Sequence, residues 1–243
     1  MALTKVSPEI LDLNNTAGTS NLRLGVNAGN SIASGGNYNV VVGDEAGTAI
    51  TTGDQNTALG NDALKSVDTG SNNTGIGAAA GDALTVGTLN TALGVASLTA
   101  DTKGSKSTAI GTFTLNSQNF TSATDTFNTA VGYSAGLAIT TGVQNTLIGG
   151  LAGDALTDAD NNVALGQGAL GSDTLGSRSV AVGSFALDNQ NFTSATNTYN
   201  VGVGYAAGAA ITTGVQNTLI GALAGDALTS SNSNTVVGYG ALS

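Results

Sequence analysis

Aliphatic residues recur along the chain at a nearly constant spacing, and each is followed by a glycine. These glycines are Gly25, Gly43, Gly60, Gly77, Gly94, Gly111, Gly132, Gly149, Gly166, Gly183, Gly204, Gly221 and Gly238. Subtraction of successive positions gives 17 in most cases, 18 once and 21 twice. A fixed period of this length indicates a repeat protein. We number each repeat from position 1, so that the glycine is position 5.

Positions 1 to 4 of each repeat predict a short β-strand. Position 1 is Asn or Ser, position 2 is Thr, Val or once Leu, position 3 is mostly small, and position 4 is always Val, Ile or Leu. β-Branched residues with period-two alternation favour a strand. A helix is disfavoured because each glycine in it costs about 1 kcal/mol. Since position 4 is aliphatic in every repeat, we predict that positions 2 and 4 face the interior.

A single repeat of this length is too small to bury its own apolar face, so successive repeats have to stack. The sequence therefore predicts an all-β fold, a parallel β-solenoid of about 13 coils that spans residues 21–243. The Asn side chains at position 1 are expected to hydrogen-bond from coil to coil. Residues 1–20 lie outside the repeat and are interpreted as an N-terminal adaptor or cap, with a partly ordered tail as the alternative.

Position 3 has the opposite parity to position 4 and is therefore predicted to point outward. On a monomer such a column would carry polar residues, and a long apolar column is typical of an interface. We expect contacts between identical chains through the small residues at this position, in particular Ala58, Ala92, Ala109, Ala130, Ala164 and Ala181. In the alternative, two sheets of one coil pack together and position 3 is internal as well.

Two repeats carry a four-residue excess, in the segments NSQNFTSATDTFN, which begins at Asn116, and DNQNFTSATNTYN, which begins at Asp188. Aromatic residues concentrate there, and aromatic side chains suit binding surfaces. The candidates for receptor contact are Phe120, Phe127, Phe192 and Tyr199. Alternatively the inserts fill a corner of the coil or interlock neighbouring chains, and this packing interpretation is the one we favour.

The composition argues against catalysis and against nucleic-acid binding. The chain has no His and no Cys, so it lacks the commonest general base and any thiolate nucleophile or metal ligand. Six basic and 16 acidic residues give a net charge of −10, which disfavours binding to nucleic acid or to an anionic membrane surface. We predict a protein that is not an enzyme, uses no cofactor or metal, and binds neither nucleic acid nor membrane. The first residues lack the apolar core of a signal peptide, which indicates a chain outside the general secretory route.

The segments NTAVG, NTALG, SVAVG and STAIG resemble the head repeats of YadA-like trimeric autotransporter adhesins, from about Asn21 to the last residue. This resemblance implies a left-handed parallel β-roll, three chains packed about one axis, and a role in surface attachment. The opening ALTKVSPEILDL resembles the start of many bacteriophage tail-fibre proteins, which implies a place on the virion, in a tail or capsid fibre.

We therefore expect a homotrimeric fibre or adhesin domain of a phage particle that presents a receptor-binding surface for host attachment. Its expected partners are identical chains, other virion or surface fibre proteins, and a glycan or protein receptor on the host cell. One alternative is the head of an adhesin on the bacterial cell surface. Another is an ice-binding solenoid, which is disfavoured because the predicted parity turns the Thr of position 2 inward. A polysaccharide-degrading solenoid is disfavoured by the missing His and the scattered carboxylates.

Overall fold

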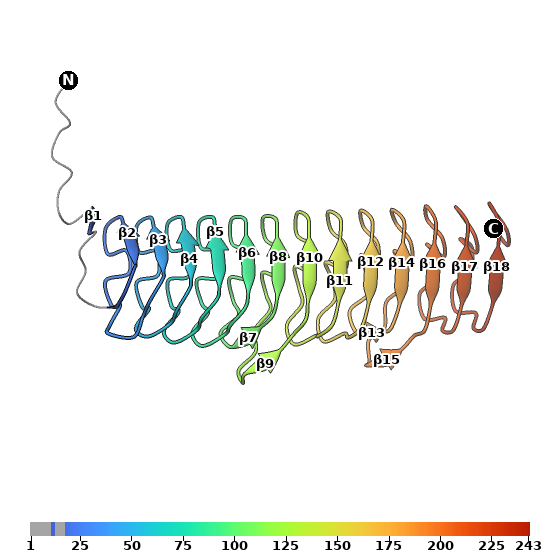
Figure 1. Ribbon diagram of the computed structural model, residues 1–243. Helices are drawn as coiled ribbons and strands as arrows, with labels where there is room; N and C mark the ends of the chain where they lie inside the picture. Colours follow the sequence, from blue (N-terminus) through green and yellow to red (C-terminus); the bar gives the residue numbers. More distant parts are fainter. Residues whose placement is uncertain (1–10, 13–17) are drawn as a thin grey trace, which may run out of the picture. The chain divides into compact units, whose positions relative to one another are not determined.

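The chain folds as a parallel β-solenoid in which each repeat makes one coil (Figure 1). The computed structural model describes residues 11–12 and 18–243, and within these ranges every regular element is a β-strand. The prediction of an all-β solenoid of about 13 coils is confirmed. Most of the predicted adaptor, residues 1–10 and 13–17, lies outside the described residues.

Two compact units make up the chain. The N-terminal unit comprises Met1–Thr112 and Asn119–Asp125, and the C-terminal unit comprises Phe113–Gln118 and Thr126–Ser243. The strands of the N-terminal unit are β1 (Leu11–Asp12), β2 (Leu22–Leu24), β3 (Val40–Val42), β4 (Thr57–Leu59), β5 (Thr74–Ile76), β6 (Thr91–Leu93), β7 (Gly104–Ser105), β8 (Thr108–Ile110) and β9 (Thr124–Asp125). Those of the C-terminal unit are β10 (Thr129–Val131), β11 (Thr146–Ile148), β12 (Val163–Leu165), β13 (Gly176–Ser177), β14 (Val180–Val182), β15 (Thr196–Asn197), β16 (Val201–Val203), β17 (Thr218–Ile220) and β18 (Thr235–Val237).

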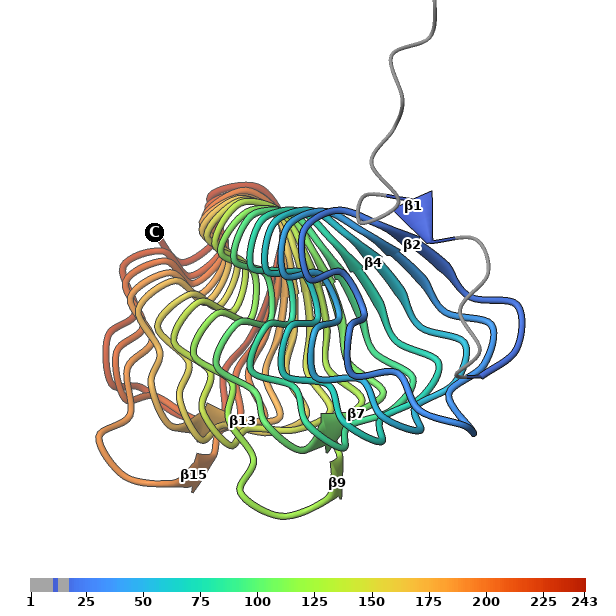
Figure 2. The same cartoon turned by 90° about the vertical axis from the view of Figure 1, so that its left-hand side faces the viewer.

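The strands at positions 2 to 4 pair in parallel, and each residue faces the same position of the next coil. Thr57 pairs with Thr74 in the N-terminal unit, and Thr146 pairs with Val163 in the C-terminal unit. β1 pairs antiparallel with β2 and so adds to that edge of the N-terminal sheet. The two long repeats add one short parallel pair each, β7 with β9 and β13 with β15. The segments beside β9 and β15 loop out beyond the neighbouring coils (Figure 2).

The glycine at position 5 allows the close stacking of coils at the corner after each strand. Gly132 has a φ of 137°, and a Cβ atom built on it would lie 2.5 Å from the carbonyl oxygen of Gly149 in the next coil. Neither that φ nor that distance is open to a residue with a side chain. The invariance of this glycine thus follows from two backbones that meet at one corner.

The predicted asparagine ladder at position 1 is confirmed. Asn73 Nδ2 donates to Asn56 Oδ1 (3.2 Å), and Asn90 Nδ2 donates to Asn73 Oδ1 (3.1 Å). The same Oδ1 atoms accept the backbone N–H of the next Asn, at 3.0 Å in both cases. The second hydrogen of each Nδ2 goes to a backbone carbonyl, for example from Asn73 to Gly87 at 2.8 Å. These side chains are fully buried, and this pattern uses both donors and both acceptor sites of the amide.

Candidate functional site

The buried and exposed faces of the strands are the reverse of those predicted. Position 3 is buried in the coil, whereas positions 2 and 4 point outward, and Leu59 and Leu165 at position 4 are 45% and 41% exposed. We call the surface made by positions 2 and 4 the outer face. The assignment of positions 2 and 4 to the interior was therefore wrong.

The small residues of position 3 make room for a leucine at position 9 of the coil. A Cβ atom on Gly75, at position 3, would lie 2.7 Å from Cγ of Leu64, at position 9 of the preceding coil. In the coil that carries Leu147 at position 3, position 9 is glycine. A Cβ atom on this glycine, Gly153, would lie 2.9 Å from Cδ2 of Leu147. Small side chains at position 3 thus reflect packing across a thin coil.

The six alanines expected at an interface between chains are all fully buried inside their own chain: Ala58, Ala92, Ala109, Ala130, Ala164 and Ala181. A side chain with no exposed surface cannot contact another chain without unfolding of its coil. The outward orientation of this column is therefore corrected. The alternative in which position 3 is internal holds, although positions 2 and 4 are not internal with it.

The outer face carries a column of aliphatic side chains in the coils of both units. Among them, the position 4 residues that stay well exposed are Leu59, Leu93, Ile148, Leu165, Ile220 and Val237. Position 2 beside them is Thr or Val in nearly every coil. A contiguous apolar surface of this kind is typical of an interaction site, so the outer face is the candidate functional surface.

Aromatic pairs lie beside the outer face of the C-terminal unit. Phe113 and Tyr133 meet edge to face, with ring centroids 6.3 Å apart, and Phe185 and Tyr205 do so at 6.4 Å. Such pairs contribute about 0.5–1.5 kcal/mol beyond their buried area. Both tyrosines are more than half exposed, so each pair presents an aromatic surface to solvent.

The inserts divide the four predicted receptor-contact residues into two kinds. Phe127 and Tyr199 are 51% and 46% exposed, but Phe120 and Phe192 are only 6% exposed. The latter two pack into the coil and anchor the insert, so their assignment to a receptor-facing surface is corrected. Apart from Phe127 and Tyr199, the exposed part of each insert consists of small and polar residues, such as Ser122 and Ser194.

A buried polar network holds the second insert in the C-terminal unit. Gln190 Nε2 donates to Asp173 Oδ2 and to Ser179 Oγ (2.8 Å), and Gln190 Oε1 accepts from Asn200 Nδ2 (2.8 Å). Asp173 Oδ1 accepts the backbone N–H groups of Gly176 (3.0 Å) and Phe192 (3.2 Å). The network replaces one layer of apolar core and ties the insert to the coil before it.

Only an acceptor can serve at position 173, because every contact that Asp173 makes there comes from a donor. Burial raises the pKa of its carboxyl, while the hydrogen bonds from Gln190 and from backbone N–H groups act in the opposite direction. The sequence contained a signal for this network. Position 12 is aliphatic in most coils but is Asp101, Gln118, Asp173 or Gln190 at and just before the inserts.

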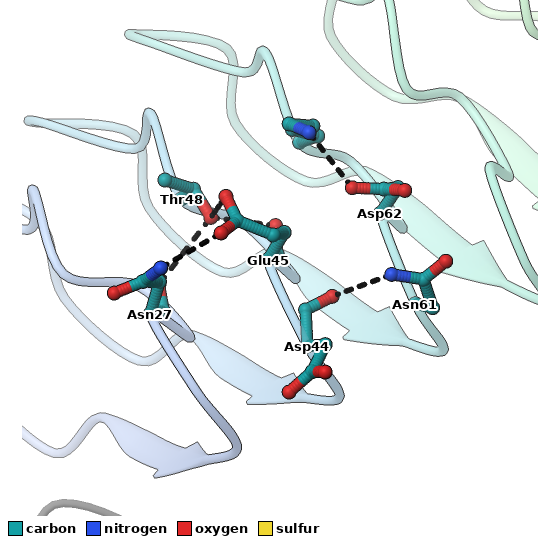
Figure 3. A network of polar contacts seen from close by, with 7 residues as sticks. Asn27, Asp44, Glu45, Thr48, Asn61 and Asp62 are labelled. Atoms are coloured by element: carbon teal, nitrogen blue, oxygen red, sulfur yellow. Dashed lines mark hydrogen bonds and ion pairs between the residues drawn. The ribbon is translucent and has the colours of Figure 1, made fainter.

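Polar side chains of the N-terminal unit also gather after the strands, at positions 6, 7 and 10 (Figure 3). Asn27 Nδ2 donates to Glu45 Oε1 (2.7 Å), and Thr48 Oγ1 donates to the backbone oxygen of Glu45 (2.7 Å). Lys65 Nζ pairs with Asp62 Oδ1 at 2.9 Å. In the part of the chain that the structure describes, no three His, Cys, Asp or Glu residues converge in an arrangement that could hold a metal ion.

No protein family model, curated protein or solved structure matches this chain. Residues 11–12 and 18–243 form no helix that is long and apolar enough to cross a membrane.

Proposed function

We propose that the protein is a homotrimeric fibre or adhesin domain, built from left-handed coils, that presents a receptor-binding surface for host attachment and catalyses no reaction. The observation that carries this proposal is the aliphatic column at position 4 of the outer face. On a soluble monomer the exposed part of these Leu, Ile and Val side chains would face water in coil after coil. Burial of the column between identical chains accounts for its uniform character from coil to coil.

Association through this column would be stabilised by many small contributions. Full burial of an aliphatic side chain stabilises by about 1.5–3 kcal/mol, and apart from Val237 in the last coil these side chains are already more than half buried. Completing their burial is worth about 1 kcal/mol each, or on the order of 10 kcal/mol over the solenoid. That sum is large enough to offset the entropic cost of association, which is about 4–15 kcal/mol.

The biological setting rests on the resemblance in the sequence. The tail-fibre-like opening favours a virion, where the partners would be other fibre proteins, and the adhesin-like repeats leave the bacterial cell surface as the alternative. On either surface the exposed loops of the inserts are the part that we assign to contact with a host glycan or protein.

A pair of lysine variants tests the assembly. Leu165→Lys places a charge on the outer face, whereas Thr213→Lys places one at an exposed position elsewhere on the same unit. We expect Leu165→Lys to shift the mass in solution from trimer toward monomer and Thr213→Lys to leave it unchanged. A trimer that persists in Leu165→Lys would count against the outer face as the interface.

A second experiment tests the attachment role. The full chain, and a variant in which both long repeats are shortened to the length of the other repeats, are compared on a glycan array and on host cells. We expect binding by the full chain and its loss in the shortened variant. Equal binding by the two proteins would remove the inserts as the contact surface.

Ice binding is the second candidate, because the orientation of position 2 differs from the prediction. Thr57, Thr74 and Thr91 stand in consecutive coils on the outer face, at the spacing of about 4.8 Å that parallel strands impose. The predicted inward orientation of these Thr side chains was wrong. Trimer formation would cover this column, so thermal hysteresis measured on the full chain separates the two functions: activity supports ice binding, and its absence removes it.

A further inference from the structure

Two columns of exposed side chains flank the strands of the outer face. The leading margin is the residue immediately before position 1, and its exposed apolar members are Tyr38, Leu89, Phe127 and Tyr199. The trailing margin comprises positions 6 and 7, just after the strand and its glycine. Its exposed apolar members include Val95, Phe113, Tyr133 and Tyr205.

Rings stand on both margins of the coil that follows each insert. Phe127 precedes β10 and Tyr133 follows it. Tyr199 precedes β16 and Tyr205 follows it. Each of the two tyrosines on the trailing margin belongs to one of the edge-to-face pairs described above.

The long repeats themselves show a second kind of match, between a cation and a ring. Lys106 precedes β8 and Phe113 follows it, while Arg178 precedes β14 and Phe185 follows it. Cationic side chains are attracted to the faces of aromatic rings. The leading margin at these levels thus carries a residue that suits the phenylalanine on the trailing margin.

Outside these levels no described coil carries a ring on both margins, although Leu89 and Val95 place an exposed aliphatic residue on each margin at β6. Tyr38 precedes β3, but Asp44 and Glu45 follow it (Figure 3). Gln144 precedes β11, but Leu151 follows it. Among residues 18–243, combinations of two rings, or of a cation and a ring, thus occur only at the levels of the two long repeats and the coils that follow them.

Side chains of neighbouring coils pair along each margin of one chain, but contacts across one coil do not explain the match between the two margins. The margins of one coil are separated by six residues that include the extended strand, which is roughly 20 Å at about 3.3 Å per residue. Side chains so far apart on one coil cannot touch each other. A surface that has to fit both margins at the same level therefore comes from another molecule.

Local backbone preference does not explain the aromatic residues either. Phe113, Phe127, Phe185 and Tyr199 all have φ between 51° and 59°, in the left-handed region that costs an ordinary residue about 1–2 kcal/mol. Asn161, on the leading margin with a φ of 60°, shows the residue type that this conformation favours. Aromatic residues occupy these positions despite the cost of the left-handed conformation, as expected for side chains selected for binding.

We propose that, at the levels of the inserts, the leading margin of one chain packs against the trailing margin of a neighbouring copy. This inference rests on the proposed homotrimer. Chains related by rotation about one axis are not displaced along it, so equal levels meet, and the contact is heterologous. Phe127 then docks on the Phe113–Tyr133 pair of the neighbour, and Tyr199 docks on the Phe185–Tyr205 pair.

The side chain of Tyr199 is held in place for such a contact. Arg178 NH1 donates to the Tyr199 hydroxyl at 3.0 Å, and its guanidinium carbon lies 5.8 Å from the ring centroid. The cation–π contact fixes one face of the ring. The remaining exposed surface of the ring is available to the neighbouring chain.

Cross-linking tests the contact cleanly, because the full chain contains no cysteine. The matched variant carries Tyr199→Cys and Tyr205→Cys. The mismatched control carries Tyr199→Cys and Tyr133→Cys, which lie at different levels of the same unit. Each variant is first weighed in solution, then treated with a short bismaleimide, and bands between chains are read on a denaturing gel.

We expect a trimer in solution for both variants and covalent trimers for the matched variant alone. Three results with a trimer in solution would overturn the margin contact without contradicting the trimer. These are cross-links in neither variant, equal cross-links in both variants, and cross-links only in the mismatched variant. A monomer for the unsubstituted chain would overturn the proposed assembly and the margin contact together. A dimer of the unsubstituted chain would overturn the three-fold arrangement and with it the proposed homotrimer.

Discussion

Replacing Asn73 by alanine should destabilise the solenoid by at least about 3 kcal/mol. The change removes the donors to Asn56 Oδ1 (3.2 Å) and to the Gly87 carbonyl (2.8 Å). It also removes the acceptor for the backbone N–H and the Nδ2 of Asn90. Asn56 Oδ1 keeps the backbone N–H of residue 73. Three other buried groups are left unsatisfied, namely the Gly87 oxygen, the Asn90 N–H and one hydrogen of Asn90 Nδ2, and each costs about 1–3 kcal/mol.

Urea unfolding followed by circular dichroism measures this loss, at one protein concentration because association also contributes to stability. Asn61→Ala is the matched control, since Asn61 is exposed on the same unit and should change the free energy of unfolding by less than about 0.5 kcal/mol. A difference of less than about 1 kcal/mol between the two variants would refute the assignment of the ladder as a main source of stability.

Three further predictions concern the corner, the core and pH. Gly132→Ala should destabilise the solenoid by more than about 2 kcal/mol, because its Cβ would lie 2.5 Å from the Gly149 oxygen. Gly150→Ala is the control and should be tolerated, because the atom nearest to its Cβ would lie 4.0 Å away. Equal urea midpoints for the two variants would contradict close stacking at the corner. Gly75→Ala should lower the free energy of unfolding by less in a Leu64→Ala background than in the native chain. A double-mutant cycle should give a coupling energy of about 1 kcal/mol or more. Strictly additive effects would argue against contact between positions 64 and 75. Burial is the largest cause that raises the pKa of Asp82, Asp154, Asp173 and Asp188. The folded state then binds more protons than the unfolded state just above the unfolded pKa of about 3.9, so stability should rise as pH falls toward about 4. A urea midpoint that falls as pH approaches about 4 would contradict this expectation.

The repeat, its strands and the asparagine ladder were predictable because they rest on local signals. The glycine at position 5 of every repeat indicates a corner, and the Asn at position 1 of nearly every repeat indicates a stack of side chains. Neither signal depends on which face of the strand is buried. Period-two alternation, however, says only that positions 3 and 4 face opposite ways. Cores and interfaces both select aliphatic residues, so Leu59 and Leu165 could not be assigned to one or the other by type.

Which face of each strand is buried depends on a contact between residues that are distant in sequence. Gly75 is small because Leu64, eleven residues earlier, fills the coil beside it, and only coordinates reveal that pairing. The buried network at Asp173 and Gln190 was readable in part, since polar residues interrupt an otherwise aliphatic column at position 12. The left-handed backbone at Phe127 and Tyr199 was not, because the local sequence argues against that conformation for an aromatic residue.

The mass of the unsubstituted full chain in solution, from analytical ultracentrifugation or light scattering, tests the central claim that the outer face is buried between identical chains. One chain has a mass of 23.5 kDa, and the account predicts a particle of three times that mass. A stable, folded species of 23.5 kDa at micromolar concentration would contradict it.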